Sequence, residues 1–358
     1  MRLIVLFFLL IQFPVSAQVN ITGKILSDES GEPIVGASVY INNSTIGSSS
    51  GTIGEYHLSS VMPGNYEIII SHIGYEPLVH RVEVKAVALR FTFRLALKEK
   101  QMRNILIMSK DQRKAKMKIF KEQFLGITQA ADKSTLLNEE DVLFEADEKP
   151  SAFKAFSEVP LEIINRELGY RIFFELKEFY IDQRSGRTYF YGFTRYVDVE
   201  KGNLAKWKKN RLRYYEGSTM HLYNSINKGV SEAEGFLFFR VMEISSNGND
   251  NSPKAMYRTP PTSLVFNDSS LHKKYLEWKG DIVIQYSKDP YYKSFLAKKV
   301  MINGSLPKGI KTTVLMLDAP AYIDANGLLE NPLAVQYSGF WGYERLANML
   351  PVNYKPGN

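Results

Sequence analysis

The sequence contains no cysteine. This absence excludes three features at once: a disulfide framework, a metal site built from thiolates, and a lipid attached to an N-terminal cysteine. A chain without these supports must be held together by burial of apolar surface. Its 358 residues, of which 44% are hydrophobic and 13% aromatic, are enough for two ordinary domains with their own cores.

A long apolar run is also missing. The most apolar stretch, Leu3–Phe13, is shorter than the roughly twenty residues that a bilayer core requires. It follows the basic Arg2 and leads to the small residues Val15-Ser16-Ala17, which is the pattern of a signal peptide over residues 1–17. We therefore expect cleavage after Ala17 and an exported protein of the periplasm or the cell surface, associated with the outer membrane in the latter case. An exported chain without disulfides suits a bacterial envelope.

Recognisable catalytic motifs are scarce. Phosphate-binding loops, dinucleotide fingerprints and the H-E-x-x-H zinc motif are absent. Gly47–Gly51 spells G-x-S-x-G, but a nucleophile elbow needs a helix after its serine, and here the strand-like TIGEYHL follows. His80 and Glu83 spell H-x-x-E, but residues three apart in a strand point to opposite faces and cannot grip one ion. We therefore expect no enzyme, no cofactor and no metal.

Positive charge is concentrated in one short segment. The formal net charge is +7, and residues 98–122 hold nine basic against three acidic residues, an excess of six. Such a segment can bind an acidic partner, can make weak contact with an anionic membrane surface, or can be a solvated helix between domains. Export argues against nucleic acid as the partner.

The first part of the chain has the two-residue period of β-strands. Apolar and polar residues alternate over residues 19–109, and turn residues recur roughly every eight to twelve positions. The short apolar run NILIMS near residue 105 completes a count of seven short strands. Seven strands without helical periodicity predict a β-sandwich of two packed sheets.

Several stretches of this part resemble the carboxypeptidase-like regulatory domain found in envelope proteins of Bacteroidetes bacteria. They are Gly23, GEPIVGASVYI, GEYHL, PGNYEI and Ile73-Gly74-Tyr75. The resemblance covers roughly residues 19–109 and implies a transthyretin-like sandwich, also described as a carbohydrate-binding-like fold. It implies no particular ligand, because in carboxypeptidases this accessory module stands apart from the catalytic one.

Helices and strands mix in the second part. Lys110–Leu125 carries Met117, Phe120 and Phe124 on one face, which predicts a basic amphipathic helix. Alternating segments on both sides of DQRSGR, at residues 182–187, predict a hairpin.

Three further elements are expected downstream. They are one helix over AKWKKNRLRYYEGSTMHLYNSINKG, a hairpin across WKGD at residues 278–281, and a short C-terminal helix that ends at Pro351.

These patterns predict a mainly β protein in three segments. Residues 1–17 are the signal peptide, residues 18–109 a seven-stranded transthyretin-like β-sandwich, and residues 110–358 an α+β domain of unknown function with an antiparallel sheet, a few helices and a basic N-terminal helix. The last segment resembles the part that follows the regulatory domain in a group of uncharacterised Bacteroidetes proteins. The stretches that carry this resemblance are PLEIINRELGYRI, LRYYEGSTMHLYNSI and GFWGYERLANMLPVNY. That resemblance implies a family but no activity.

Two clusters in the second domain combine aromatic and basic residues, as a partner or glycan surface does. In KWKKNRLRYY the aromatic side chains can equally face the core while the lysines reach into solvent. In GFWGYER they can equally belong to a terminal helix docked on a sheet. The candidate residues are Trp207, Lys208, Lys209, Arg211, Trp341, Tyr343 and Arg345.

Three functions follow from these observations. The first is a non-enzymatic cell-envelope binding or scaffolding protein, in which an exposed edge strand or a loop tip such as Asn42–Gly51 contacts an envelope protein or glycan. The alternative is an unrecognised envelope hydrolase, which needs a cleft with ionisable groups of shifted pKa in the second domain. The third is a structural domain pair whose basic helix rests on membrane headgroups.

Overall fold

The structure is a computed structural model, and it describes residues 18–99, 103–243, 254–271, 273–288, 311–324, 327–331 and 334–357. The predicted signal peptide over residues 1–17 lies outside the described residues. Among those that are described, no helix is long and apolar enough to cross a membrane. The predicted fold class is confirmed, because strands in several antiparallel sheets dominate and most helices come late in the chain.

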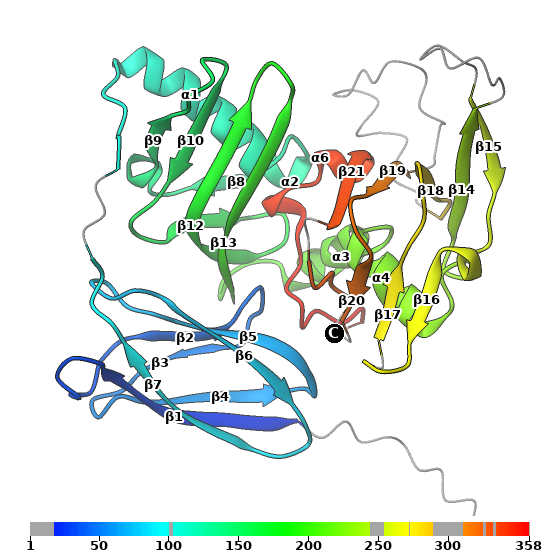
Figure 1. Ribbon diagram of the computed structural model, residues 1–358. Helices are drawn as coiled ribbons and strands as arrows, with labels where there is room; N and C mark the ends of the chain where they lie inside the picture. Colours follow the sequence, from blue (N-terminus) through cyan, green and yellow to red (C-terminus); the bar gives the residue numbers. More distant parts are fainter. Residues whose placement is uncertain are drawn as a thin grey trace, which may run out of the picture.

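The first seven strands form a sandwich of two sheets (Figure 1). One sheet has the order β4-β1-β7 and the other β3-β2-β5-β6. Alternate residues of both sheets point inward, and Ile21, Ile25, Val39, Ile68 and Ile70 are fully buried between them. The strands are β1 (Val19–Ser27), β2 (Ser38–Ile41), β3 (Gly47–Ser49), β4 (Glu55–Val61), β5 (Gly64–Ser71), β6 (Leu78–Val84) and β7 (Leu89–Leu95).

The strand count matches the prediction, but its membership differs. The G-x-S-x-G stretch contains an edge strand, β3, which pairs with β2. Ser50, which follows β3, accepts a hydrogen bond from the Ala37 N–H at 2.8 Å and donates one to the Ile34 carbonyl at 2.6 Å. The NILIMS run lies outside the sandwich, because its Ile105 pairs with β9 (Leu143–Ala146) of the second part instead.

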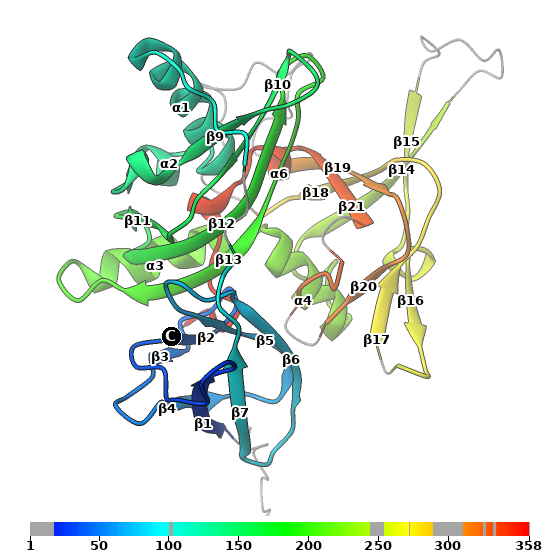
Figure 2. The same cartoon turned by 60° about the vertical axis from the view of Figure 1, so that its left-hand side comes forward.

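The largest sheet among the described residues has six antiparallel strands. Its order is β8-β11-β12-β10-β9, and β13 pairs along the other edge of the long strand β12. Helix α1 (Lys110–Phe124) lies across one face, as Figure 2 shows, and buries the predicted residues Met117, Phe120 and Phe124. The remaining elements are β8 (Ser134–Leu136), β10 (Ala152–Phe156), β11 (Leu161–Asn165), β12 (Tyr170–Asp182), β13 (Arg187–Asp198) and α2 (Gln129–Asp132). The predicted hairpin at residues 182–187 joins β12 to β13.

The expected long helix is two helices, α3 (Leu204–Tyr215) and α4 (Thr219–Lys228). The break falls at Gly217, whose φ of +74° is a left-handed conformation that glycine adopts without strain. Ser218 then caps α4 by accepting a hydrogen bond from the His221 N–H at 3.1 Å. A polar cap directly after a glycine ends one helix and begins the next.

The rest of the chain builds two smaller sheets, with orders β15-β14-β18-β19-β21 and β16-β17-β20. The expected hairpin across residues 278–281 is wrong, because β17 and β18, on either side of it, belong to different sheets. The strands are β14 (Phe236–Glu243), β15 (Lys254–Arg258), β16 (Val265–Asp268), β17 (Lys273–Leu276), β18 (Ile282–Tyr286), β19 (Lys311–Leu317), β20 (Ala321–Ile323) and β21 (Val335–Gly339).

The C-terminal segment contains only short helical turns. They are α6 (Phe340–Tyr343) and the 3-10 turn η4 (Leu346–Asn348), separated by extended backbone. The predicted helix does not continue because this backbone bonds to other elements: the Ala347 N–H donates to Leu125 at 3.2 Å, and the Ala347 carbonyl accepts from the Asn165 amide at 2.8 Å. The end of the chain thereby joins α1 to β11.

Candidate functional site

The sandwich docks on the second part through the outer face of its four-stranded sheet. Tyr40 of β2 and Ile69 of β5 point away from the sandwich core, yet both are buried, because they pack against Phe193 of β13. The Tyr40 hydroxyl donates a buried hydrogen bond of 2.9 Å to Glu175 of β12. Burial, followed by the nearby Glu175 carboxylate, raises the pKa of Tyr40 well above its ordinary value. The phenol therefore stays protonated as a donor.

The loop after β2 completes this interface. The Asn43 N–H donates to the Thr194 carbonyl at 2.7 Å, and the Ser44 carbonyl accepts from the Tyr196 N–H at 2.9 Å. From the C-terminal segment, the Val352 N–H donates to the Asn43 carbonyl at 2.7 Å. The start of the predicted contact region 42–51 is therefore bonded to β13 and to the chain's own C-terminal segment, whereas β3 at residues 47–49 remains an edge strand of its sheet.

Beyond the sandwich, the outer face of β12–β13 is uncovered and aromatic. Tyr189 and Tyr191 alternate with the inward residues of β13, and the exposed fractions of their side chains are 38% and 57%. Tyr180 of β12 pairs directly with Tyr189, with ring centroids 5.2 Å apart and an interplanar angle of 18°. We call the surface formed by Tyr180, Tyr189 and Tyr191, together with Lys177 and Glu178 beside them, the tyrosine face.

The tyrosine face is ordered by polar contacts. The Tyr189 hydroxyl donates to Glu178 Oε1 at 2.7 Å, and burial together with this carboxylate raises the pKa of Tyr189 to about 12. The Lys177 ammonium lies 3.5 Å from Glu175 Oε2, so this lysine is paired. Tyr191 meets Phe193 edge-on at 5.7 Å, which joins the face directly to the sandwich interface.

The first predicted cluster lies on α3 and is largely buried. Trp207 is 9% exposed, and its indole N–H donates to the Arg166 carbonyl at 3.1 Å. The Arg211 guanidinium lies 3.8 Å from the centroid of the Tyr170 ring and donates to backbone carbonyls and to an aspartate. Lys208 and Lys209 are exposed. This cluster therefore offers a partner two lysines but no aromatic platform.

The second predicted cluster, at α6, is also mostly internal. Trp341 is 5% exposed, and its indole N–H donates to the Gly217 carbonyl at 2.8 Å, so it supports the α3–α4 break. Tyr343 and Arg345 are half-buried. Burial lowers the pKa of the Arg345 guanidinium. The structure does not bring the two clusters together into a ligand surface, because their indoles fill the core instead.

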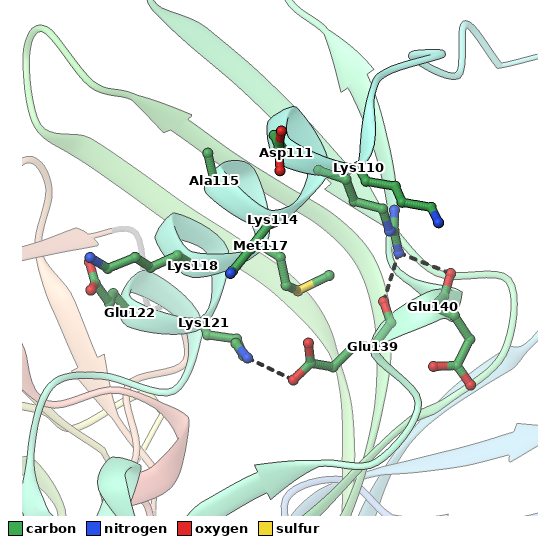
Figure 3. A pocket seen from close by; sticks show the side chains of 11 residues that line it. Lys110, Asp111, Lys114, Ala115, Met117, Lys118, Lys121, Glu122, Glu139 and Glu140 are labelled. Atoms are coloured by element: carbon green, nitrogen blue, oxygen red, sulfur yellow. Dashed lines mark hydrogen bonds and ion pairs between the residues drawn. The ribbon is translucent and has the colours of Figure 1, made fainter.

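The basic helix α1 borders an open groove of about 890 Å³ (Figure 3). Figure 3 shows Lys121 pointing across it to Glu139, with an Nζ–Oε1 distance of 2.7 Å. Arg113 donates to the carbonyls of Val142, Glu139 and Glu140. Five basic and four acidic side chains line the groove. Much of the positive charge of α1 is thus balanced locally, and the groove offers little net charge to an acidic partner.

A second groove, of about 520 Å³, contains the most catalysis-like set of side chains. His221 Nδ1 accepts from the Gly217 N–H at 3.0 Å, and Nε2 lies 3.4 Å from Glu234 Oε2. Ser225 lines the same groove, but its hydroxyl donates to the Leu222 carbonyl at 2.6 Å. A Ser-His-Glu triad needs one imidazole nitrogen directed at the serine. Here both nitrogens face other groups, so the triad is not assembled.

Sequence reasoning identified the strands of the tyrosine face but not their importance. In the sequence, Tyr189, Tyr191 and Phe193 belong to the alternating segment after residues 182–187, and that alternation predicts only a paired strand. The residues next to them point the other way: Phe190 packs against the core of the second part, and Thr194 is buried. Three successive aromatic residues at alternate positions, Tyr189, Tyr191 and Phe193, are the signal that could have marked this surface, because a solvated sheet face normally carries polar side chains.

The fold defines a sandwich module docked on a larger α+β part of the same chain. Residues 21–107 match the family model described as the CarboxypepD_reg-like domain, so this part of the chain is a CarboxypepD_reg-like domain, as its motifs predicted. The match ends before α1. The exact division between residues 109 and 110 stays a prediction.

Comparison with curated proteins gives no match. Among solved structures, the pilus 2b backbone protein of group B streptococcus is 14% identical, with a TM-score of 0.20, over 22% of this chain and 41% of that one. A DUF3823 family protein from Bacteroides ovatus is 11% identical, with a TM-score of 0.19, over 52% of this chain and 83% of that one. The major pilin subunit of Bacillus cereus is 9% identical, with a TM-score of 0.19, over 91% of this chain and 97% of that one.

This chain thus spans less than half of the streptococcal pilus protein. TM-scores this low carry no information about function, and none is transferred from these three proteins.

Proposed function

We propose that this protein is a non-enzymatic, exported binding or scaffolding protein of the bacterial cell envelope, and that the tyrosine face is its binding surface. The observation that carries the proposal is the row of exposed rings on the outer face of β12–β13, where a purely structural sheet would expose polar side chains. The CarboxypepD_reg-like domain supports it, because in carboxypeptidases this kind of module is an accessory to catalysis.

The docked sandwich gives the surface a fixed shape. Tyr40, Asn43 and Ser44 anchor it to β12 and β13 beside the exposed rings. A surface that is already ordered loses little conformational entropy when a ligand binds, which favours affinity. In this proposal the sandwich is a rigid support for the site and not a module on a flexible linker.

The other two functions have less support. The hydrolase alternative would use the groove around His221, where the serine, imidazole and carboxylate do not form a triad. The membrane-headgroup function would use α1, whose groove is nearly neutral.

In-cell crosslinking tests the proposal. The full-length tagged protein is crosslinked in its native host, purified, and compared with Tyr189→Ala/Tyr191→Ala and with Tyr257→Ala. Tyr257 is a matched control, because it is 53% exposed on the distant strand β15. We expect one dominant adduct in the wild type and in Tyr257→Ala, and its loss in the double variant. An unchanged adduct in the double variant would place the binding surface elsewhere, and reproducible absence of any adduct would refute a binding role.

Export has its own measurement. Mass spectrometry of the protein recovered from the host should show a chain that begins at Gln18, and cell fractionation should place it in the envelope. A chain that retains residues 1–17 in the cytoplasm would refute both parts of the export proposal.

A further inference from the structure

We infer that the ligand of the tyrosine face is an uncharged polysaccharide chain. This inference rests on the proposed function and adds the chemical class of the ligand. It depends on three features of the described residues: the spacing of the rings, the balance of charge around them, and the continuity of the face with the sandwich interface.

The rings are spaced for a chain of sugar units. Tyr189 and Tyr191 lie two residues apart on one face of β13, which separates them by roughly 7 Å along an antiparallel strand. That spacing is longer than one pyranose unit and shorter than two, so the two rings can contact different units of one chain. Tyr180 stacks on one face of the Tyr189 ring across the strand pair, which holds that ring in place. Tyrosine rings have few rotatable bonds, so the platform is already formed before a ligand binds.

The polar groups beside the rings suit hydroxyl groups. Glu178 accepts from the Tyr189 hydroxyl and has further acceptor capacity, and Lys177 is a donor. The apolar C–H face of a sugar can therefore lie on the rings while its hydroxyls reach these charged side chains. Tyrosine is also common at protein interfaces, so it is the charged side chains beside the rings, which the centre of a protein interface lacks, that favour a sugar.

Charge balance favours an uncharged ligand. Lys177 is paired with Glu175 at 3.5 Å, and Lys154, which lies beside Tyr180 in the sheet, is paired with Asp147 at 3.6 Å. Glu178 keeps its negative charge, because Tyr189 donates to it as a neutral phenol, and the cation nearby is Arg187, two residues before Tyr189 on the same face of β13. The surroundings of the rings therefore carry no large excess of either sign, and an anionic or cationic polymer gains little from them.

The sandwich interface sets one boundary of the site. Phe193 continues the aromatic row but is covered by Tyr40 and Ile69, so the exposed part of the row begins at Tyr191. A chain lying along β13 would pass from the sandwich interface toward the hairpin at residues 182–187. The site is therefore closed toward the sandwich and open toward the hairpin.

Affinity gel electrophoresis of the full chain tests the inference. The probes are soluble neutral polysaccharides, namely a β-glucan, a xylan, a galactomannan and amylopectin, with polygalacturonate as an anionic control. We expect retardation by at least one neutral polymer that survives roughly 1 M salt, where the screening length is about 3 Å. Tyr189→Ala and Tyr191→Ala should each weaken retention about tenfold, as truncation of a central tyrosine does at other interfaces. Tyr191→Phe should retain most of it, and Tyr257→Ala all of it.

Each outcome has a defined meaning. Retention of a neutral polymer that depends on Tyr189 and Tyr191 but not on Tyr257 supports the inference, provided that the urea unfolding midpoints of the variants match the wild type. Retention by polygalacturonate alone, abolished by salt, overturns it. No retention by any neutral polymer also overturns it. If crosslinking at the same time yields a protein adduct that requires the tyrosine face, the proposed function stands and only the ligand class is wrong.

Discussion

The hydrogen bond between Tyr40 and Glu175 allows a direct test of whether the sandwich is an integral part of the molecule. Tyr40→Phe removes one hydroxyl and keeps the ring that packs on Phe193. Tyr40 is 3% exposed and Glu175 8%, so water cannot easily replace the lost donor. Lys177 remains as a partner for the carboxylate at 3.5 Å.

The expected loss follows from the charge of the acceptor. A hydrogen bond to a charged group contributes about 1.5–3 kcal/mol, and a buried carboxylate left without one donor carries that cost in the variant. We therefore expect Tyr40→Phe to lower the free energy of unfolding by about 1.5–3 kcal/mol. Tyr257→Phe, at an exposed position, should change it by less than about 0.5 kcal/mol.

Urea unfolding measures this loss with two probes. All three tryptophans lie in the second part of the chain, so their fluorescence follows that part, while far-ultraviolet circular dichroism follows both parts. We expect the two transitions to coincide in the wild type and to separate or shift together to lower urea in Tyr40→Phe. A double-mutant cycle with Glu175→Gln should show a coupling energy. Strict additivity, or a loss below about 0.5 kcal/mol, would refute the reasoning.

Further substitutions test individual contacts. Hydrogen bonds from serine hydroxyls hold the pKa of Asp182 at about 2. Because this lies below the unfolded value of about 3.9, the stabilisation is present above roughly pH 4 and is lost as the pH falls toward 2. Acid unfolding of Asp182→Asn should lack this dependence, and an unchanged curve would contradict the assignment. Gly217→Ala places a Cβ 2.4 Å from a Tyr286 ring carbon at a φ of +74°. We expect it to lower the free energy of unfolding by more than the strain of a left-handed residue alone, which is about 1–3 kcal/mol. Gly229→Ala has open space at a φ of +71°, so in the same urea assay its loss of stability should be that of the strain alone. Trp207→Phe should lower stability by about 1 kcal/mol, through loss of its 3.1 Å hydrogen bond, without changing polysaccharide retention. Loss of retention at unchanged stability would restore Trp207 as a ligand residue.

The sequence by itself determined those features that depend on neighbours along the chain. The two-residue period and the turn residues of residues 19–109 predicted the sandwich, and the resemblance of its motifs to a known domain predicted the family. The stripe of Met117, Phe120 and Phe124 predicted α1, and the polar turn at residues 182–187 predicted the β12–β13 hairpin. These are local properties, because side-chain direction in a strand or helix follows from backbone geometry alone.

Only the tertiary structure decided which faces are covered. Tyr40 and Tyr191 both point outward from their sheets. Tyr40 is buried against Phe193 of β13, which is remote from it in the sequence, whereas Tyr191 is exposed. Trp207 and Trp341 belong to clusters of aromatic and basic residues that suggest a binding surface. In the structure both side chains are buried, and their indole N–H groups donate to backbone carbonyls. Burial depends on contacts between segments remote in sequence, and no local period encodes which outward face another segment will occupy. The binding surface is therefore what the docking of the sandwich leaves uncovered.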